Sequence, residues 1–161
     1  MTGSATLLMQ KALGAAPLPT PSLPPGFAFT PFDVAHHARA ARALLNAAYA
    51  RGGGDVLDFE AWWPAVESDE EYDPALCFVL TRTATSELAG FAQCWASGFV
   101  KDIGVQPDLR RRGLGRALML EIFRAFQASG IAEVRLKVQA DNPSGAPVFC
   151  RTLGMETVPL A

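Results

Sequence analysis

One segment, residues 100–118 with the sequence VKDIGVQPDLRRRGLGRAL, constrains the fold of this chain more than any other. Its first six residues are rich in β-branched side chains, which favour a strand. Pro107 ends the pairing because proline has no N–H to donate, and Asp108 suits a turn or a helix N-cap. From Leu114 onward, apolar residues recur at helical spacing. The segment therefore predicts a strand, a short loop and the start of a helix.

The loop carries three arginines, Arg110, Arg111 and Arg112, followed by Gly113 and Gly115. The first turn of a helix has backbone N–H groups without intrahelical partners, and the helix dipole adds partial positive charge there. Glycines leave the backbone open to a ligand, and guanidinium groups match phosphate oxygens. These features predict a pyrophosphate cradle. The alternative is a solvated, arginine-rich helix start, and the flanking strand and apolar helix favour the cradle.

Two other phosphate-binding motifs fit the segment less well. A P-loop requires Gly-Lys-Ser/Thr, whereas Gly115 is followed by Arg116 and Ala117. The dinucleotide fingerprint requires a third glycine three residues after the second, and Leu118 stands there. Neither motif explains the segment.

The spacing of Arg110, Gly113 and Gly115 resembles motif A of the GCN5-related N-acetyltransferase (GNAT) superfamily, Arg/Gln-x-x-Gly-x-Gly/Ala. The preceding Ile-Gly-Val resembles that family's fourth strand. The resemblance implies acetyl-CoA as co-substrate and an oxyanion donor among the backbone N–H groups of that strand. The cofactor-binding residues it implies are Ile103, Gly104, Val105, Arg110, Arg111, Arg112, Gly113, Leu114, Gly115, Arg116 and Asn142.

The C-terminal part resembles the family's motif B, through Asn142 and the Leu-Gly-Met ending at 153–155. In the family, a tyrosine between these points is taken as the acid that protonates the departing CoA thiolate. Here that position is Cys150 when counted back from Gly154, and Phe149 when counted forward from Asn142. Cys150 could donate the proton itself or be a small buried apolar residue. A thiolate also leaves tolerably near neutral pH without an acid.

Asp102 lies in the strand that the resemblance assigns to the cofactor, and is the second catalytic candidate. It could orient a substrate ammonium or accept its proton, because an amine must be deprotonated before it attacks. The local pattern is similar to diamine-type acetyltransferases, but Lys101 stands where those place a second acid. Alternatively, Asp102 pairs with a neighbouring cation, or strand alternation points it away from the substrate.

Composition limits the remaining possibilities. A chain of 161 residues with 50% apolar and 19% charged residues suits one globular domain with a full core. The net charge of −2 gives no general attraction to nucleic acid. Three cysteines without metal spacing and two adjacent histidines predict no metal site and a reducing, cytoplasmic location. No apolar run approaches membrane-spanning length, so no membrane association is expected.

We expect residues 1–26 to form a proline-rich N-terminal arm, with a possible short helix at 5–13, and residues 27–161 to form the GNAT-like domain. A strand is expected at 27–30 and a helix from Asp33 to about residue 50. Three glycines at 52–54 predict a loop that either gates the site or merely links two helices. The second helix, capped by Asp58, carries Trp62 and Trp63, of which one is expected in the core and one at the acceptor.

The remaining pattern predicts a hairpin at 76–81 and 88–95, a helix at 114–129, a strand at 133–139, a short helix at 147–153 and a final strand near 155. Strand, helix and strand in succession imply a parallel pair with a right-handed crossover. The expected fold class is therefore α/β, with a mixed, mostly antiparallel sheet and a parallel central strand pair flanked by helices.

The function expected from these features is acetyl-CoA-dependent N-acetyl transfer to a primary amine of a small molecule, amino acid or peptide, by direct attack on the thioester. The alternative is a module of the same fold that binds acyl-CoA without turning it over. Nucleic-acid binding through the arginines is disfavoured, because no interleaved aromatic surface accompanies them. The short final strand leaves pairing groups available. Members of the GNAT superfamily frequently dimerise through this end of the sheet, so the resemblance implies a homodimer here.

Overall fold

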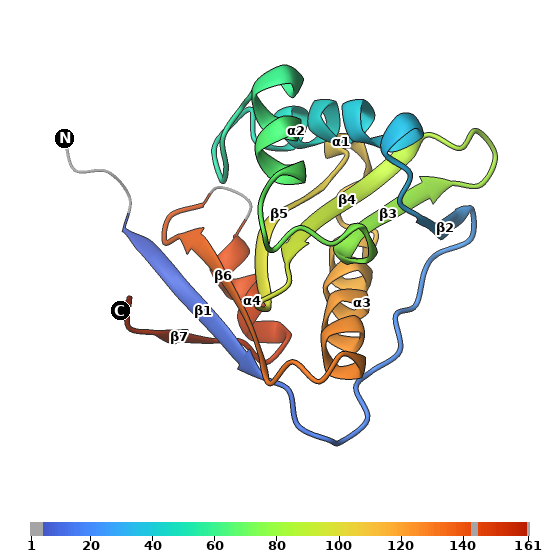
Figure 1. The fold of residues 1–161 in the computed structure, drawn as a ribbon. Helices are drawn as coiled ribbons and strands as arrows, with labels where there is room; N and C mark the ends of the chain where they lie inside the picture. Colours follow the sequence, from blue (N-terminus) through green and yellow to red (C-terminus); the bar gives the residue numbers. More distant parts are fainter. Residues whose placement is uncertain (1–4, 143–144, 161) are drawn as a thin grey trace.

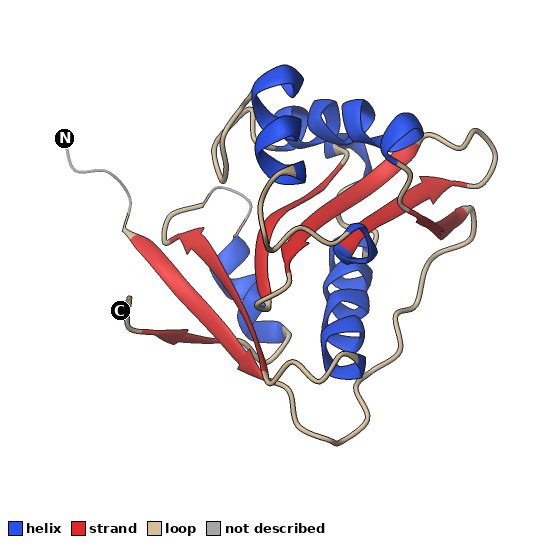
Figure 2. Cartoon of the chain, in the orientation of Figure 1, coloured by secondary structure: helices blue, strands red, loops and turns tan. Residues whose placement is uncertain are grey.

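The computed structural model describes residues 5–142 and 145–160. A single seven-stranded sheet runs through this part of the chain, in the order β2-β3-β4-β5-β6-β1-β7 (Figures 1 and 2). The strands are β1 (Thr6–Ala12), β2 (Phe27–Pro31), β3 (Cys77–Arg82), β4 (Leu88–Trp95), β5 (Phe99–Val105), β6 (Glu133–Gln139) and β7 (Glu156–Val158). The α-helices are α1 (Val34–Ala48), α2 (Phe59–Glu67), α3 (Leu114–Ala128) and α4 (Ala146–Thr152).

All neighbouring strands are antiparallel except β5 and β6, which form the parallel pair at the centre of the sheet. Helix α3 connects these two strands, as the strand–helix–strand pattern predicts. The expected fold class is therefore confirmed. The strands β4 and β6 begin and end at the predicted residues.

The core lies on both faces of the sheet. On one face, α1 and α2 pack their apolar residues against Phe91 and Val79 of the sheet. On the other face, the apolar side of α3 and Cys150 of α4 join a larger cluster that includes Met9 of β1. Figure 1 shows the two pairs of helices on opposite sides of the strands. The burial of Leu118, Ile122 and Phe126 confirms the apolar side predicted for α3.

The N-terminal segment differs from the expectation. The short helix expected at 5–13 is wrong, because residues Thr6–Ala12 form β1. This strand pairs with β6 along its whole length and with β7 over residues 8–10. Part of the expected arm therefore lies inside the sheet. Met9 supplies the physical reason, because its side chain is fully buried in the core while the backbone of β1 pairs on both sides. The rest of the segment stays attached, with Gln127 Nε2 donating to Gly14 O at 2.6 Å.

No helix in the part of the chain that the structure describes is long and apolar enough to cross a bilayer.

Candidate active site

The strands β5 and β6 meet at one end only. Their single ladder pair among the described residues is Phe99 with Arg135, where the Arg135 N–H donates to Gly98 O at 2.9 Å. Beyond this pair the two strands diverge (Figure 1). The later residues of β5 therefore have a ladder partner on the β4 side alone.

The direction of the free β5 donors follows from the antiparallel ladder with β4. The Gln106 N–H donates to Ala89 O at 2.9 Å, so it points toward β4. Backbone groups alternate in direction along a strand, and the N–H groups of Ile103 and Val105 therefore point the other way, into the gap beside β6. These are two of the groups that the sequence resemblance assigned to the acyl-CoA site.

Tyr49, the C-cap residue of α1, reaches this point of β5. Its hydroxyl oxygen accepts the Ile103 N–H at 3.1 Å and lies 3.1 Å from Ile103 O. The same hydroxyl lies 3.1 Å from Oδ1 of Asp102. Burial, followed by the charge of Asp102, raises the pKa of Tyr49, so its phenol stays protonated.

Asp102 is half-buried on the side of the sheet that α1 covers, as its bond with Tyr49 shows. Burial raises the pKa of its carboxyl, while Lys101, Tyr49 and Arg42 act in the opposite direction. No salt bridge joins Asp102 to a cation among the described residues. A carboxyl of raised pKa beside backbone donors that have no ladder partner is a candidate for a general base.

The start of α3 has the open geometry that the cradle requires. Gly113 is its N-cap residue with φ 81°, a left-handed conformation that favours glycine. A Cβ on Gly115 would lie 3.8 Å from Phe149 Cζ and 4.0 Å from Val105 Cγ2, which are ordinary contacts. Gly113 is therefore required by backbone conformation, whereas Gly115 keeps the first turn of the helix clear next to β5. Asp108, expected as a cap or turn residue, lies in a 3₁₀ turn instead of capping α3.

The arginines of the cradle are all exposed, and one of them is already engaged. Arg110 Nη2 donates to Ala48 O at 3.0 Å, a carbonyl in the last turn of α1 where a cation is favourable. Arg111 adopts φ 65°, an uncommon value for a residue with a side chain. Arg112 and Arg116 extend from the loop and the first turn of α3 with exposed side chains. Three of the four arginines thus stay available to a phosphate, whereas Leu114 is buried beneath them.

The glycine loop after α1 lies between the two halves of the candidate site. A Cβ on Gly54 would come within 2.5 Å of Tyr49 Cε2, and a Cβ on Gly53 within 2.9 Å of Asn142 Nδ2. The loop therefore brings Tyr49 and Asn142, which are far apart in sequence, to the same region. Pro143 and Ser144, which follow Asn142 in the motif B segment, lie outside the described residues.

Cys150 is a core residue. Its side chain is 3% exposed and belongs to the core cluster beneath α3. Burial raises the pKa of its thiol to about 11, which disfavours proton donation to a thiolate of ordinary pKa near 8.5. The burial favours the alternative of a small buried residue over Cys150 as the acid.

Trp62 and Trp63 are both core residues, 5% and 6% exposed. The expectation that only one of them is core is therefore wrong. Trp62 packs edge-on against Phe91, and Trp63 packs edge-on against Tyr72. The nine-residue helix α2 packs against both α1 and the sheet and therefore buries neighbouring side chains, which helical spacing alone does not predict. Neither indole is open to an acceptor.

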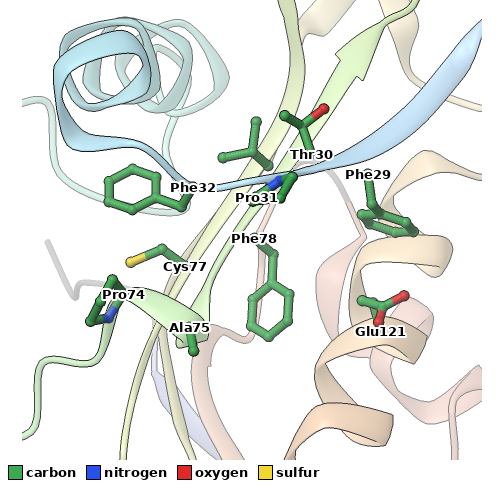
Figure 3. Close-up of a pocket in the computed structure, with 10 residues that line it drawn as sticks. Phe29, Thr30, Pro31, Phe32, Pro74, Ala75, Cys77, Phe78 and Glu121 are labelled. Atoms are coloured by element: carbon green, nitrogen blue, oxygen red, sulfur yellow. The ribbon is translucent and has the colours of Figure 1, made fainter.

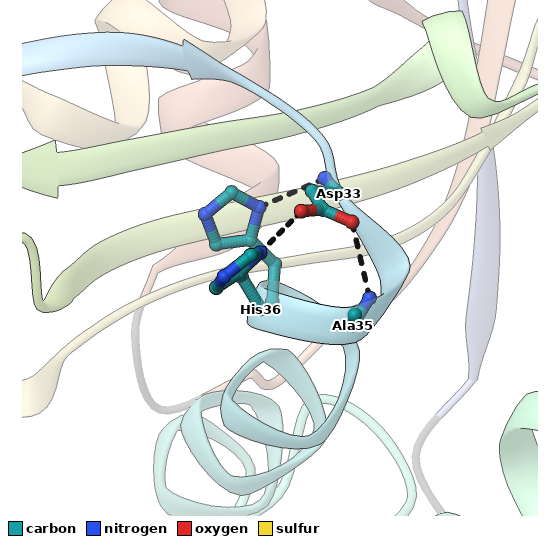
Figure 4. Close-up of polar contacts among 4 residues, drawn as sticks. Asp33, Ala35 and His36 are labelled. Atoms are coloured by element: carbon teal, nitrogen blue, oxygen red, sulfur yellow. Dashed lines mark hydrogen bonds and ion pairs between the residues drawn. The ribbon is translucent and has the colours of Figure 1, made fainter.

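Figure 3 shows a pocket at the β2 edge of the sheet, lined mainly by residues of β2, β3 and the turn before β3. It contains none of the residues expected in the site. The adjacent histidines are also elsewhere, at the start of α1 (Figure 4). There the Asp33 N–H donates to His37 Nδ1 at 2.9 Å, and Asp33 contacts His36 Nδ1 and the Ala35 N–H, so this cluster caps the helix.

Sequence reasoning missed Tyr49. It is one of only two tyrosines and lies two residues before Arg51 of the Arg-Gly-Gly-Gly loop, which is the signal that could have identified it. In the described ranges, no group of three or more His, Cys, Asp or Glu side chains lies close enough to hold a metal ion.

Comparison with protein families and with known proteins gives matches to acetyltransferases. The model of the acetyltransferase (GNAT) family matches residues 38–155. A mycothiol acetyltransferase of Kocuria rhizophila is 31% identical over 165 residues, covering 92% of this chain and 52% of the relative. That of Saccharopolyspora erythraea is 36% identical over 91 residues, covering 53% of this chain and 29% of the relative. The chain thus spans about half or less of the length of these relatives.

Solved structures agree on the fold. A GCN5-related N-acetyltransferase from Sphaerobacter thermophilus superimposes with a TM-score of 0.81 at 29% identity, over 95% of this chain and 48% of that one. The ribosomal-protein-S18-alanine N-acetyltransferase of Escherichia coli superimposes with a TM-score of 0.61 at 24% identity, over 78% and 76% of the two chains, and supports the fold alone. Because the family model covers most of the domain, and β5 donors without a ladder partner lie beside the start of α3, this chain belongs to the GNAT acetyltransferase family.

Proposed function

We propose that this protein transfers the acetyl group of acetyl-CoA to a primary amine of a small molecule, amino acid or peptide. The observation that carries the proposal is the position of the outward β5 N–H groups next to the open first turn of α3. A thioester and a pyrophosphate of one ligand require such a pair of sites, one for a carbonyl oxygen and one for phosphate oxygens.

The residues divide into two groups under this proposal. Backbone N–H groups at the start of α3, with Arg111, Arg112 and Arg116, bind the pyrophosphate. Ile103 and Val105 bind carbonyl oxygens of the acyl-pantetheine arm through their backbone. Asn142 borders the same arm from the end of β6.

Asp102 orients the neutral amine, whose nitrogen attacks the carbonyl carbon. As the N–C bond forms, the nitrogen loses one proton to the Asp102 carboxylate, the C–S bond breaks and CoA leaves as a thiolate. The burial that raises the pKa of Asp102 makes its carboxylate a better base than an exposed aspartate, because the Brønsted relation rewards a pKa nearer the working pH.

The names of the relatives support acetyl transfer as the reaction. Because those proteins are about twice as long as this chain or longer, the acceptor is proposed only as a primary amine. The second candidate function is an acyl-CoA-binding module that turns over slowly. The core position of Cys150 favours it, because α4 then supplies no acid for the leaving thiolate.

Two further expectations remain predictions. The edge strand β7 is only three residues long and pairs with β1 alone among the described strands, so we propose that a second copy pairs there to form a homodimer. Cys77, Cys94 and Cys150 are free and buried, consistent with the proposed cytoplasmic location. Light scattering that gives a monomer at working concentration would contradict the dimer.

Calorimetry with acetyl-CoA tests the binding site, and release of free CoA in the presence of a panel of amines tests the transfer. Binding together with amine-dependent release is expected. Binding without release from any amine would favour the acyl-CoA-binding module. Absence of binding by a folded protein would contradict both functions.

A further inference from the structure

The hydroxyl of Tyr49 lies next to the backbone of Ile103 in β5. It accepts the N–H of Ile103 at 3.1 Å, on the side of β5 that faces the gap beside β6. One N–H supplies a single hydrogen, so the hydroxyl oxygen lies where any acceptor of that donor must lie. Under the proposed function, that acceptor is the carbonyl oxygen of the thioester.

We propose that Tyr49 is a catalytic residue that donates its O–H to the acyl oxygen, so that this hydroxyl and the Ile103 N–H together stabilise the charge that develops there. The inference rests on the proposed function and adds a side-chain donor to an oxyanion site otherwise made of backbone N–H groups. It gives the chain a second oxyanion donor from α1, an element that motif A and motif B do not include.

The contacts of the hydroxyl allow this exchange. A tyrosine O–H has one hydrogen that rotates about the C–O bond, and in the structure Asp102 Oδ1 and Ile103 O are both 3.1 Å away as acceptors. When an acyl oxygen takes the Ile103 N–H, the hydroxyl is displaced from that donor and its hydrogen turns to the new oxygen. The ring lies against Gly54 and occupies the space that a side chain at residue 54 would take.

The chemistry of the phenol favours donation of a hydrogen bond over transfer of a proton. Burial and the charge of Asp102 raise the pKa of Tyr49, so the phenol is a weaker acid than a thiol of ordinary pKa near 8.5. Protonation of the CoA thiolate by Tyr49 is therefore unfavourable. During transfer the amine proton goes to Asp102, CoA leaves as a thiolate and Tyr49 keeps its proton throughout.

A purely structural role makes a different prediction. The hydroxyl could simply satisfy the backbone groups of Ile103 that β6 leaves without a partner. In that case Tyr49→Phe lowers stability but leaves a bound thioester unaffected, because the ligand itself then satisfies the N–H. A polarised thioester carbonyl is the property that separates the two roles.

The experiment measures the infrared carbonyl stretch of ¹³C-labelled acetyl-CoA bound to the protein without any amine. Tyr72→Phe is the matched control, because Tyr72 is the only other tyrosine and its ring packs against Trp63 in the core. We expect the wild type and the control to shift the stretch to lower wavenumber, and Tyr49→Phe to lose most of that shift. With an amine that the wild type acetylates, kcat of Tyr49→Phe should fall about a hundredfold with little change in KM for acetyl-CoA.

An unchanged carbonyl shift in folded, acetyl-CoA-binding Tyr49→Phe would overturn the inference and leave the proposed function intact. Tighter acetyl-CoA binding with undiminished kcat would also overturn it, because Tyr49 would then only block the site. If the wild type does not bind acetyl-CoA, the proposed function and the inference fail together. Should Tyr49→Phe not fold, Gly54→Ala provides the second test, since its Cβ would push the tyrosine ring out of place and should reduce the shift in the same way.

Discussion

Gly53 lies against Asn142 so closely that a Cβ on residue 53 would come within 2.9 Å of the Asn142 Nδ2 atom. The loop after α1 and the segment after β6 are thereby in contact at the edge of the candidate site. No strand pairing joins these two segments, so this contact sets the distance between them. A single added carbon at residue 53 should therefore push them apart.

Gly53→Ala should both destabilise the protein and weaken acetyl-CoA binding. The residue has φ 95°, and a side chain in a left-handed conformation costs about 1–2 kcal/mol before the contact with Asn142 is counted. Gly26→Ala is the matched control, because Gly26 has φ 92° and a Cβ there would meet nothing within 4 Å. Urea denaturation and calorimetry should show a larger loss for Gly53→Ala, and equal losses in both variants would contradict the role of the contact.

Gly115→Glu should weaken acetyl-CoA binding by about a hundredfold or more, because it places a carboxylate where phosphate oxygens bind. The matched variant Gly115→Ala adds only a methyl group at ordinary contact distance from Phe149 and Val105. It should keep the fold and most of the affinity. Calorimetry decides the question, and unchanged affinity in folded Gly115→Glu would refute the cradle.

The stability of the protein should depend on pH through Asp102. Burial raises its pKa above the ordinary value of 3.8, so the folded protein binds this proton more tightly than the unfolded chain does. The contribution of Asp102 to the free energy of unfolding therefore falls as pH rises from 3.8 through the raised pKa. Asp102→Asn has no carboxyl to titrate and lacks this loss. The free energy of unfolding of the variant minus that of the wild type should therefore increase as pH rises across that window, and then level off.

Urea denaturation of both proteins at several pH values measures this difference. The carboxyls of Asp33 and Glu60, whose pKa values are lowered, are present in both proteins and cancel. A difference that stays constant with pH would show that Asp102 titrates normally. The same variant should lose most of its acetyl transfer if the carboxylate is the base.

Trp62→Ala and Trp63→Ala should each lower the free energy of unfolding by about 3–5 kcal/mol, as for other large side chains removed from a core. Acceptor kinetics of the protein that remains folded should change little. A large change in KM for the amine without loss of stability would restore the acceptor role predicted from the sequence.

Cys150→Ala should cost on the order of 1 kcal/mol in stability, comparable to the loss of one buried methyl group, and should change turnover by less than about tenfold. Cys150→Tyr, which restores the residue of the family motif, should overpack the core and destabilise the protein. Thermal denaturation and kinetics of both variants test this. A hundredfold loss of turnover in stable Cys150→Ala would make the thiol a participant.

Local patterns predicted the elements that carry the cofactor site. The apolar spacing of α3 and the alternation of β6 are periodic signals contained within one segment, and both elements formed as predicted. The positions of Gly113 and Gly115 next to β5 followed from the order of strand and helix. Periodicity succeeds here because one face of each element is buried against a neighbour that is close in sequence.

Contacts between distant segments were not predictable in this way. Thr6 pairs with Gln139, and nothing in the first dozen residues indicates that partner. Tyr49 acquires its environment only when α1 is packed across β5. Both tryptophans are buried because α2 contacts two neighbours at once. In each case tertiary packing, and not local propensity, decides the outcome.

The position of β1 between β6 and β7 has a consequence for how the chain reaches its native state. β6 can pair with β5 as soon as α3 has formed, but β1 must wait for a partner at the far end of the sequence, and β7 must then wait for β1. Such long-range pairing raises the contact order and slows folding. During synthesis on the ribosome, the first strand therefore remains without its partners until nearly all of the domain has emerged.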